Sequence, residues 1–259
     1  MTVGLRVIAL LAATAAAQAS AAAPPSGLLG TWDVVRVEVD RADQMHWEVQ
    51  PQDPELLYRE LVIGKTETHF AADKETCKEP SWKPSAMTWG ELFGKGFQRP
   101  EGGGRSTKPT PKDFELDVES RDKATAYTLC RNKKLKGSKV WLEAEWVVLP
   151  ATDTLVVHQD PQVLLVLKRR AADARPRASF ACEKAVSPTE KAICSSFELA
   201  GWDRSVADAY TQALKRNAST QDKILADQKD WLRKRDACGD KTSCIDDLLW
   251  RRVDDLKQY

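Results

Sequence analysis

Hydrophobic and polar positions alternate along short segments in the first two thirds of the chain, as is typical of half-buried β-strands. The segments are residues 32–39, 114–118, 124–129, 140–148, 154–157 and 163–167. Turn-forming residues separate them. Many short strands at close spacing predict an antiparallel β-barrel or β-sandwich, and they disfavour a doubly wound parallel sheet.

The pattern changes to helical spacing after about residue 180. Ser187, Pro188 and Glu190 form a helix-start signal, because serine is a good N-cap, proline suits the first helical position, and glutamate three residues after the cap completes a capping box. The sequence therefore predicts that a helix begins at Pro188.

Longer helices are expected further along. Apolar residues recur at helical spacing over residues 199–215 and 220–237. Gly239 is expected to end the second of these helices, and Asp240 to cap a last one. This part of the chain is therefore predicted to be a small all-α hairpin or bundle.

A charged, proline-containing segment at residues 168–178 separates the two patterns. It has few large apolar residues, as linkers between domains do. We therefore expect a β-rich domain over residues 25–167 and a helical domain over residues 179–259. The length of 259 residues suits two domains of ordinary size.

Residues 1–23 have the composition of a secretory signal peptide. One cation, Arg6, precedes an apolar run, and Ala19, Ser20 and Ala21 form a small-x-small cleavage signal. The apolar run is shorter than the roughly 20 residues that a membrane-spanning helix needs. We expect a soluble protein without a membrane span, exported to the periplasm or secreted.

All six cysteines follow this segment, and an even number in an oxidising compartment is typical of disulfides. Two lie in the β-rich part and four in the helical part, which suggests one bridge in the former. The last four allow three pairings, of which we favour the local one. The predicted bridges are Cys77 with Cys130, Cys182 with Cys194, and Cys238 with Cys244. No Cys-x-x-Cys spacing occurs, so no common zinc or thioredoxin-like site is expected.

The formal charges nearly cancel, with 39 Lys and Arg against 38 Asp and Glu. Residues 178–259 hold 14 of each sign, so the helical part is neutral by itself. A nucleic-acid binder needs a basic surplus to neutralise phosphates, so nucleic acid is not expected as a partner. Neither part of the chain has the net charge that would steer a partner over long range.

Catalysis is not expected either. The three histidines, His46, His69 and His158, all lie in the β-rich part, and none belongs to a recognisable nucleophile or metal-binding arrangement. His69 and His158 fall in predicted strands and are expected to be ordinary sheet residues. The sequence predicts no cofactor and no metal.

The first predicted strand opens with Gly30, Thr31 and Trp32. This triplet resembles the Gly-x-Trp signature of lipocalin-like barrels, in which the tryptophan commonly stacks with an arginine near the last strand. Lys168, Arg169 and Arg170 end the last predicted strand and are candidates for that cation. The resemblance implies a barrel that binds a small apolar ligand, whereas the alternative is an ordinary core tryptophan.

The helical part carries a second set of motifs. They are Phe180-x-Cys182-x-Lys184-Ala185, Pro188-x-Glu190-Lys191-Ala192-Ile193-Cys194, Glu198-Leu199-Ala200-x-x-Asp203, Tyr210, Gln228-x-x-Trp231-Leu232-x-x-Arg235-x-x-Cys238 and Cys244. Together they resemble the LprI-type lysozyme inhibitors, a family of small, exported, disulfide-stabilised helical domains of bacterial envelopes. The chain departs from the family pattern at Trp202, where leucine is usual, and at Trp250, where tyrosine is commoner.

The resemblance implies that the helical part binds lysozyme or another envelope protein. Its candidate binding residues are Lys184, Glu190, Lys191, Asp203 and Arg235. A lysozyme cleft is built around two carboxylates, so an inhibitor is expected to present cations or hydrogen-bond donors to it. Lys191 and Arg235 have an alternative role, which is to pair with neighbouring carboxylates or to cover the core. Two hypotheses therefore stand: an envelope lysozyme inhibitor, and a lipocalin-like carrier with an accessory docking module.

Overall fold

A computed structural model describes residues 24–42, 49–70, 82–97, 108–128, 146–160 and 163–259, with the backbone alone at 77–78, 135–136, 141–142 and 160. The predicted signal peptide and His46 lie outside the described residues. So does the predicted Cys77–Cys130 bridge, because neither side chain is described. That bridge stays a prediction.

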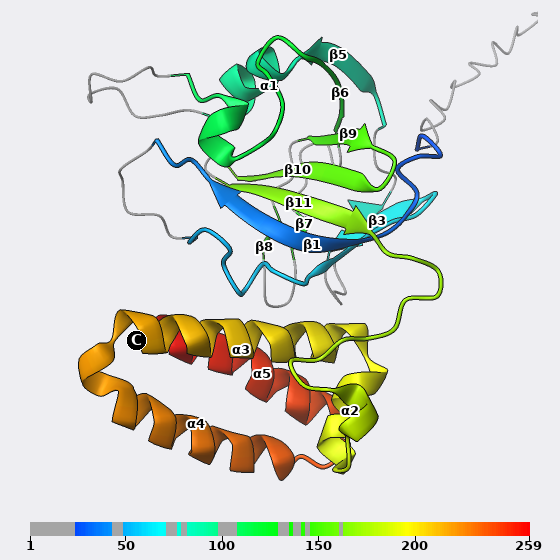
Figure 1. Cartoon of the computed structure of the whole chain (residues 1–259). Helices are drawn as coiled ribbons and strands as arrows, with labels where there is room; N and C mark the ends of the chain where they lie inside the picture. The colour runs from blue at the N-terminus through cyan, green and yellow to red at the C-terminus, as the bar shows by residue number, and fades with distance from the viewer. Residues whose placement is uncertain are drawn as a thin grey trace, which may run out of the picture.

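Nine described strands form one antiparallel sheet in the order β4, β3, β2, β1, β11, β10, β9, β6, β5 (Figure 1). The bounds are β1 Gly30–Val39, β2 Glu60–Ile63, β3 Glu67–Phe70, β4 Cys77–Lys78, β5 Pro84–Thr88, β6 Lys123–Tyr127, β9 Val147–Ala151, β10 Thr154–Asp160 and β11 Val163–Arg169; β7 Leu135–Lys136 pairs separately with β8 Trp141–Leu142. Over the described residues the sheet is open, with β4 and β5 as its edges. The predicted antiparallel β fold class is confirmed.

β1 and β11 lie at the middle of this sheet and pair along most of their length. Every residue from Val163 to Leu167 is buried, which explains the continuous apolar run of β11. The pairing shifts between Val34 and Arg36, so that Val35 is an extra residue that points outward and is 39% exposed. The bulge places an apolar side chain beside the helical region.

The prediction of a strand at residues 114–118 is wrong. Phe114 ends a 3-10 helix, η1 Pro111–Phe114, and Glu115 follows in the left-handed conformation with φ of 52°. Proline at the start of η1 and hydrogen bonds from Thr110 to the Asp113 carboxylate favour the turn over an extended strand. Apolar and polar residues do alternate over residues 114–118, but the turn-forming residues just before them determine the backbone conformation.

The helical region follows the prediction closely. Its helices are η2 Cys182–Lys184, α2 Pro188–Ser195, α3 Phe197–Arg216, η3 Ala218–Thr220, α4 Gln221–Asp236 and α5 Thr242–Lys257. The bridges Cys182–Cys194 and Cys238–Cys244 are both present, as predicted. The prediction that Asp240 caps α5 is wrong, because the cap position is Lys241. Both residues lie within the loop that the Cys238–Cys244 bridge closes.

The sheet and the helical region share one cluster of buried apolar side chains, and α3 lies nearest the sheet (Figure 1). A second, smaller cluster surrounds α1 Trp89–Gly96 on the other side of the sheet. Of the segment predicted as a linker, residues 168–178, the first two belong to β11, and residues 170–178 form no helix or strand.

Candidate functional site

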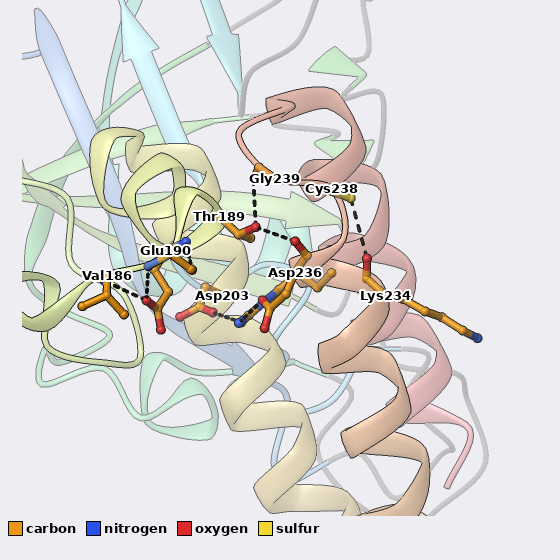
Figure 2. Close-up of polar contacts among 10 residues, drawn as sticks. Val186, Thr189, Glu190, Asp203, Lys234, Asp236, Cys238 and Gly239 are labelled. Atoms are coloured by element: carbon orange, nitrogen blue, oxygen red, sulfur yellow. Dashed lines mark hydrogen bonds and ion pairs between the residues drawn. The ribbon is translucent and has the colours of Figure 1, made fainter.

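The charged residues of the helical motif meet where the first half of α3 lies beside the end of α4 (Figure 2). The Asp203 carboxylate accepts the backbone N–H of Ser179 at 2.7 Å and lies 3.5 Å from Nη1 of Arg235. Both side chains are less than a tenth exposed. Arg235 also donates through Nε and Nη2 to the Asp236 carboxylate, at 3.0 and 2.8 Å. This buried pair fastens the incoming chain at Ser179 to two helices.

Thr189 connects α2 to the same corner. Its fully buried hydroxyl donates toward the carbonyl oxygens of Gly239 and Asp236, at 2.8 and 3.2 Å (Figure 2). These carbonyls belong to the end of α4 and the residue that closes it, where helices leave acceptors unsatisfied. Thr189 thus satisfies acceptors at a helix end and locks α2 against α4.

Glu190 acts as the second half of the predicted capping box. Its carboxylate accepts the backbone N–H groups of Ser187 at 3.0 Å and Val186 at 2.9 Å, while Ser187 Oγ accepts the N–H of Glu190. These hydrogen bonds, first that of Ser187, hold the pKa of Glu190 below its usual range, and the positive charge of Arg235 adds to the effect. Glu190 therefore orders the chain just before α2.

A solvent-facing surface lies on the outer side of this corner. Lys184 and Lys191 are exposed, and Val186 between them is 78% exposed. The Cys182–Cys194 bridge spans the segment, and Glu190 holds the backbone of Val186. We call Lys184, Val186 and Lys191 the stapled surface. It presents one apolar side chain and two cations from a backbone fixed by a disulfide and a cap.

The structure thus divides the five predicted binding residues into two groups. Glu190, Asp203 and Arg235 come together in the polar corner and make internal contacts. Lys184 and Lys191 lie outside that corner and face solvent. The alternative role considered for Arg235, pairing with carboxylates, is what the structure shows.

Val186 and Thr189 were not among the predicted residues. A signal for Val186 was present, because the residue before an N-cap often packs against the fourth helical residue. Here that fourth residue is Lys191, which offers no apolar partner, and Val186 is left exposed. Thr189 gave no such signal, since its acceptors lie about fifty residues away in the chain.

Contacts between the sheet region and α3 explain one departure from the family pattern. Trp202, where the motif usually has leucine, lies under the buried guanidinium of Arg59, whose Cζ is 3.5 Å from the ring centroid. Arg59 also donates to Ser205 Oγ at 2.8 Å, and burial lowers its pKa to about 9. Trp202 therefore contacts the β-rich part of the chain. A helical domain that stands alone has no such part, so it has no use for this contact.

Two further contacts close this junction. The Tyr58 hydroxyl donates to the Asp208 carboxylate at 2.6 Å, and Lys257, near the end of α5, donates to Asp53 at 3.1 Å. Both bonds join residues more than 140 positions apart. The orientation of the helical region relative to the sheet is therefore held by side chains as well as by the connecting segment.

The tryptophan at the start of β1 has the cation predicted for it. Cζ of Arg169 lies 4.0 Å from the centroid of the Trp32 ring, and the two residues are paired across β1 and β11. Arg169 Nη1 donates to the Leu29 carbonyl at 2.6 Å. This contact closes one end of the β1–β11 pair.

Fold and site together define a class of protein: an antiparallel sheet joined to a small, disulfide-stabilised helical region whose motif residues largely bond one another. The helical region is similar to a known family, since the family model described as Lysozyme inhibitor LprI matches residues 182–256. The match confirms the resemblance seen in the motifs, and the family is one of inhibitors rather than catalysts. Searches among curated proteins and among solved structures gave no match, so the lipocalin resemblance gains no support from them.

Within the described parts of the chain, no three His, Cys, Asp or Glu side chains are grouped closely enough to hold a metal ion. No helix there is both long and apolar enough to cross a membrane. The two disulfides and the family match indicate an extracytoplasmic location.

Proposed function

We propose that this chain is a periplasmic or secreted protein of the bacterial envelope that binds and inhibits lysozyme through its helical region. The observation that carries the proposal is the LprI family match over residues 182–256. The disulfide bridges of that region support it, because they suit an oxidising compartment. The chain is assigned no catalytic step and no cofactor.

The stapled surface is the part of the molecule that we assign to lysozyme contact. An exposed valine held on a rigid backbone is suited to anchor an interface, since little conformational freedom is lost on binding. Lys184 and Lys191 flank it and complement a cleft whose function requires two carboxylates. Glu190, Asp203 and Arg235 are positioning residues in this proposal, because they hold the backbone that presents the surface.

Recognition is expected to act at contact range. The helical part has 14 residues of each charge, so it has no net field to attract a basic lysozyme. Complementarity to lysozyme must then come from the two lysines and the valine. Affinity should be set more by a slow dissociation rate than by an association rate raised by electrostatic steering.

The test is hydrolysis of a peptidoglycan suspension by lysozyme, with the full-length protein added. We expect saturable inhibition by the wild type, weakened about tenfold or more in the Lys184→Glu, Lys191→Glu double variant and also in Val186→Asp. Lys229→Glu, at an exposed position on α4, is the matched control and should inhibit like the wild type. Absence of inhibition by the wild type at roughly 50 micromolar, with animal-type and other lysozymes, defeats the proposal.

A second candidate is a carrier of a small apolar ligand, and the contact between Trp32 and Arg169 favours it as a feature of lipocalin-like barrels. The helical region would then be an accessory docking module. Native mass spectrometry of the purified full-length protein distinguishes the two, since a co-purifying apolar ligand supports the carrier. A protein free of ligand that inhibits lysozyme supports the first proposal instead.

A further inference from the structure

A basic groove lies where the ends of β1 and β11, the segment after β11, and the first half of α3 meet. Its hollow has a volume of about 280 Å³, close to the lower end of the usual range of small-molecule sites. One wall is formed by Asp33 to Val35 with residues 168–170, another by Phe197, Gly201 and Arg204, and the connecting segment contributes Ala174, Arg175 and Arg177. Six lining residues are Lys or Arg and one is acidic, in a protein of formal charge +1.

Three of the six cations have structural partners. Arg170 forms ion pairs with Asp33 and Glu60, and Lys168 pairs with Asp153 at 3.0 Å. Arg169 donates to main-chain carbonyls and covers Trp32. These cations hold the strand ends in place, and carboxylates balance the charges of Arg170 and Lys168.

The other three, Arg175, Arg177 and Arg204, have no carboxylate partner among the described residues. Arg175 and Arg177 are exposed, and Arg204 Cζ lies 3.5 Å from the centroid of the Tyr58 ring. Three guanidiniums around one hollow repel each other, and an anion bound between them removes that repulsion. Guanidinium groups recognise carboxylates and phosphates through paired N–H bonds.

The groove is preorganised, because the segment that carries two of these arginines is tied at both ends. At its start, Arg170 N–H donates to the Thr31 carbonyl and its guanidinium lies 3.8 Å from the Phe197 ring centroid. At its end, Ser179 N–H donates to Asp203. Pro176 lies between the two arginines, restricts the backbone of Arg175 to extended conformations, and favours both side chains on one face.

A second, smaller hollow of about 160 Å³ adjoins the groove and shares Tyr58, Arg170 and Phe197 with it. Trp202 completes its aromatic lining, and the buried Arg59 lies at its wall. The exposed Val35 adds apolar surface to the outer groove. The neighbouring hollows therefore offer both cations and aromatic rings, and Glu60 and Glu198 also line the inner one.

We propose that this groove binds a small molecule that carries at least two negative charges, as phosphate or carboxylate, next to an apolar or aromatic group. The anionic end lies among Arg175, Arg177 and Arg204, and the apolar end lies against Tyr58 and Phe197. The size of the hollow suits a small molecule better than a polymer or a folded partner. The site is separate from the stapled surface and goes beyond lysozyme inhibition.

The test is isothermal titration of the full-length protein with three probes: phenyl phosphate, phthalate and inorganic phosphate. Phenyl phosphate and phthalate distinguish phosphate from carboxylate recognition, and inorganic phosphate lacks the apolar group. The informative variant is Arg175→Gln with Arg177→Gln, which changes two exposed side chains. Lys215→Gln with Lys229→Gln removes the same charge from exposed helical positions and is the control.

We expect saturable one-to-one binding of phenyl phosphate or phthalate, at least about threefold tighter than inorganic phosphate. The arginine double variant should weaken it by about tenfold or more, and the lysine control by less than about twofold. No saturable binding of any probe by the wild type overturns the proposal, as does equal weakening in the lysine control. Phenyl phosphate binding no tighter than phosphate overturns its apolar part. Lysozyme inhibition by the arginine variant should equal that of the wild type, which separates this test from that of the proposed function.

Discussion

Replacing Arg235 by alanine is expected to destabilise the protein by about 3 kcal/mol. Removing one partner of a buried ion pair typically costs about 3–5 kcal/mol, because the remaining charge stays buried. The lower end applies here, since Asp203 keeps the N–H of Ser179 at 2.7 Å and the pair itself is separated by 3.5 Å. The side chain of Asp203 is only 4% exposed, so its carboxylate is largely shielded from bulk water.

Urea unfolding under non-reducing conditions measures this loss, followed by circular dichroism and by tryptophan fluorescence. Arg233→Ala is the matched control, because Arg233 is 75% exposed and pairs with Asp230 on the helix surface. It should change the free energy of unfolding by less than about 0.5 kcal/mol. A double-mutant cycle with Asp203→Asn should give a coupling energy of about 1–3 kcal/mol.

Two results would refute this reasoning. One is a loss below about 1 kcal/mol for Arg235→Ala together with a coupling energy near zero, which would mean that the pair does not hold the corner. The other is a protein of unchanged stability that no longer inhibits lysozyme. Arg235 would then touch the partner directly, and its assignment as a positioning residue would be wrong.

Three further outcomes are expected. His158 is buried and stacked on Trp146, and burial lowers its pKa to about 4, so the unfolded chain takes up a proton first as pH falls. The free energy of unfolding should therefore drop by about 3 kcal/mol as pH falls from about 6.5 to about 4, and this drop should vanish in His158→Phe but persist in His69→Gln. Removing the Cys182–Cys194 bridge with two serines should cost about 3 kcal/mol in urea unfolding on the loop-entropy estimate; an effect below about 1 kcal/mol would show that the loop is ordered without it. Trp202→Leu should cost about 2 kcal/mol by the same measurement, and an unchanged stability would contradict the role given to its contact with Arg59.

The helical region was predictable because its signals are local. Ser187 and Glu190 lie three residues apart, and the two bridges span 12 and 6 residues. Helix caps and short disulfide loops depend on such neighbours. Thr88 and Glu91 form the same capping box at α1, so a signal for that missed helix was also present.

The rest depended on contacts that sequence spacing does not reveal. β2 and β3 are four residues long, too short for a clear alternation. Arginine is usually a surface residue, yet Arg59 is buried against Trp202, which lies in another region of the chain. Likewise, the basic groove combines a strand end, a connecting segment and a helix, so no single stretch carries its pattern.

The pairing of β1 with β11 has a consequence for the order in which the chain folds. These two strands adjoin although about 130 residues separate them, so their pairing cannot be completed until the chain has been synthesised through Arg169. The contacts within the helical region are far more local, and local contacts form faster. We therefore expect the C-terminal helical region to fold before the N-terminal sheet. The contact of Lys257 with Asp53, which joins the two, should form last.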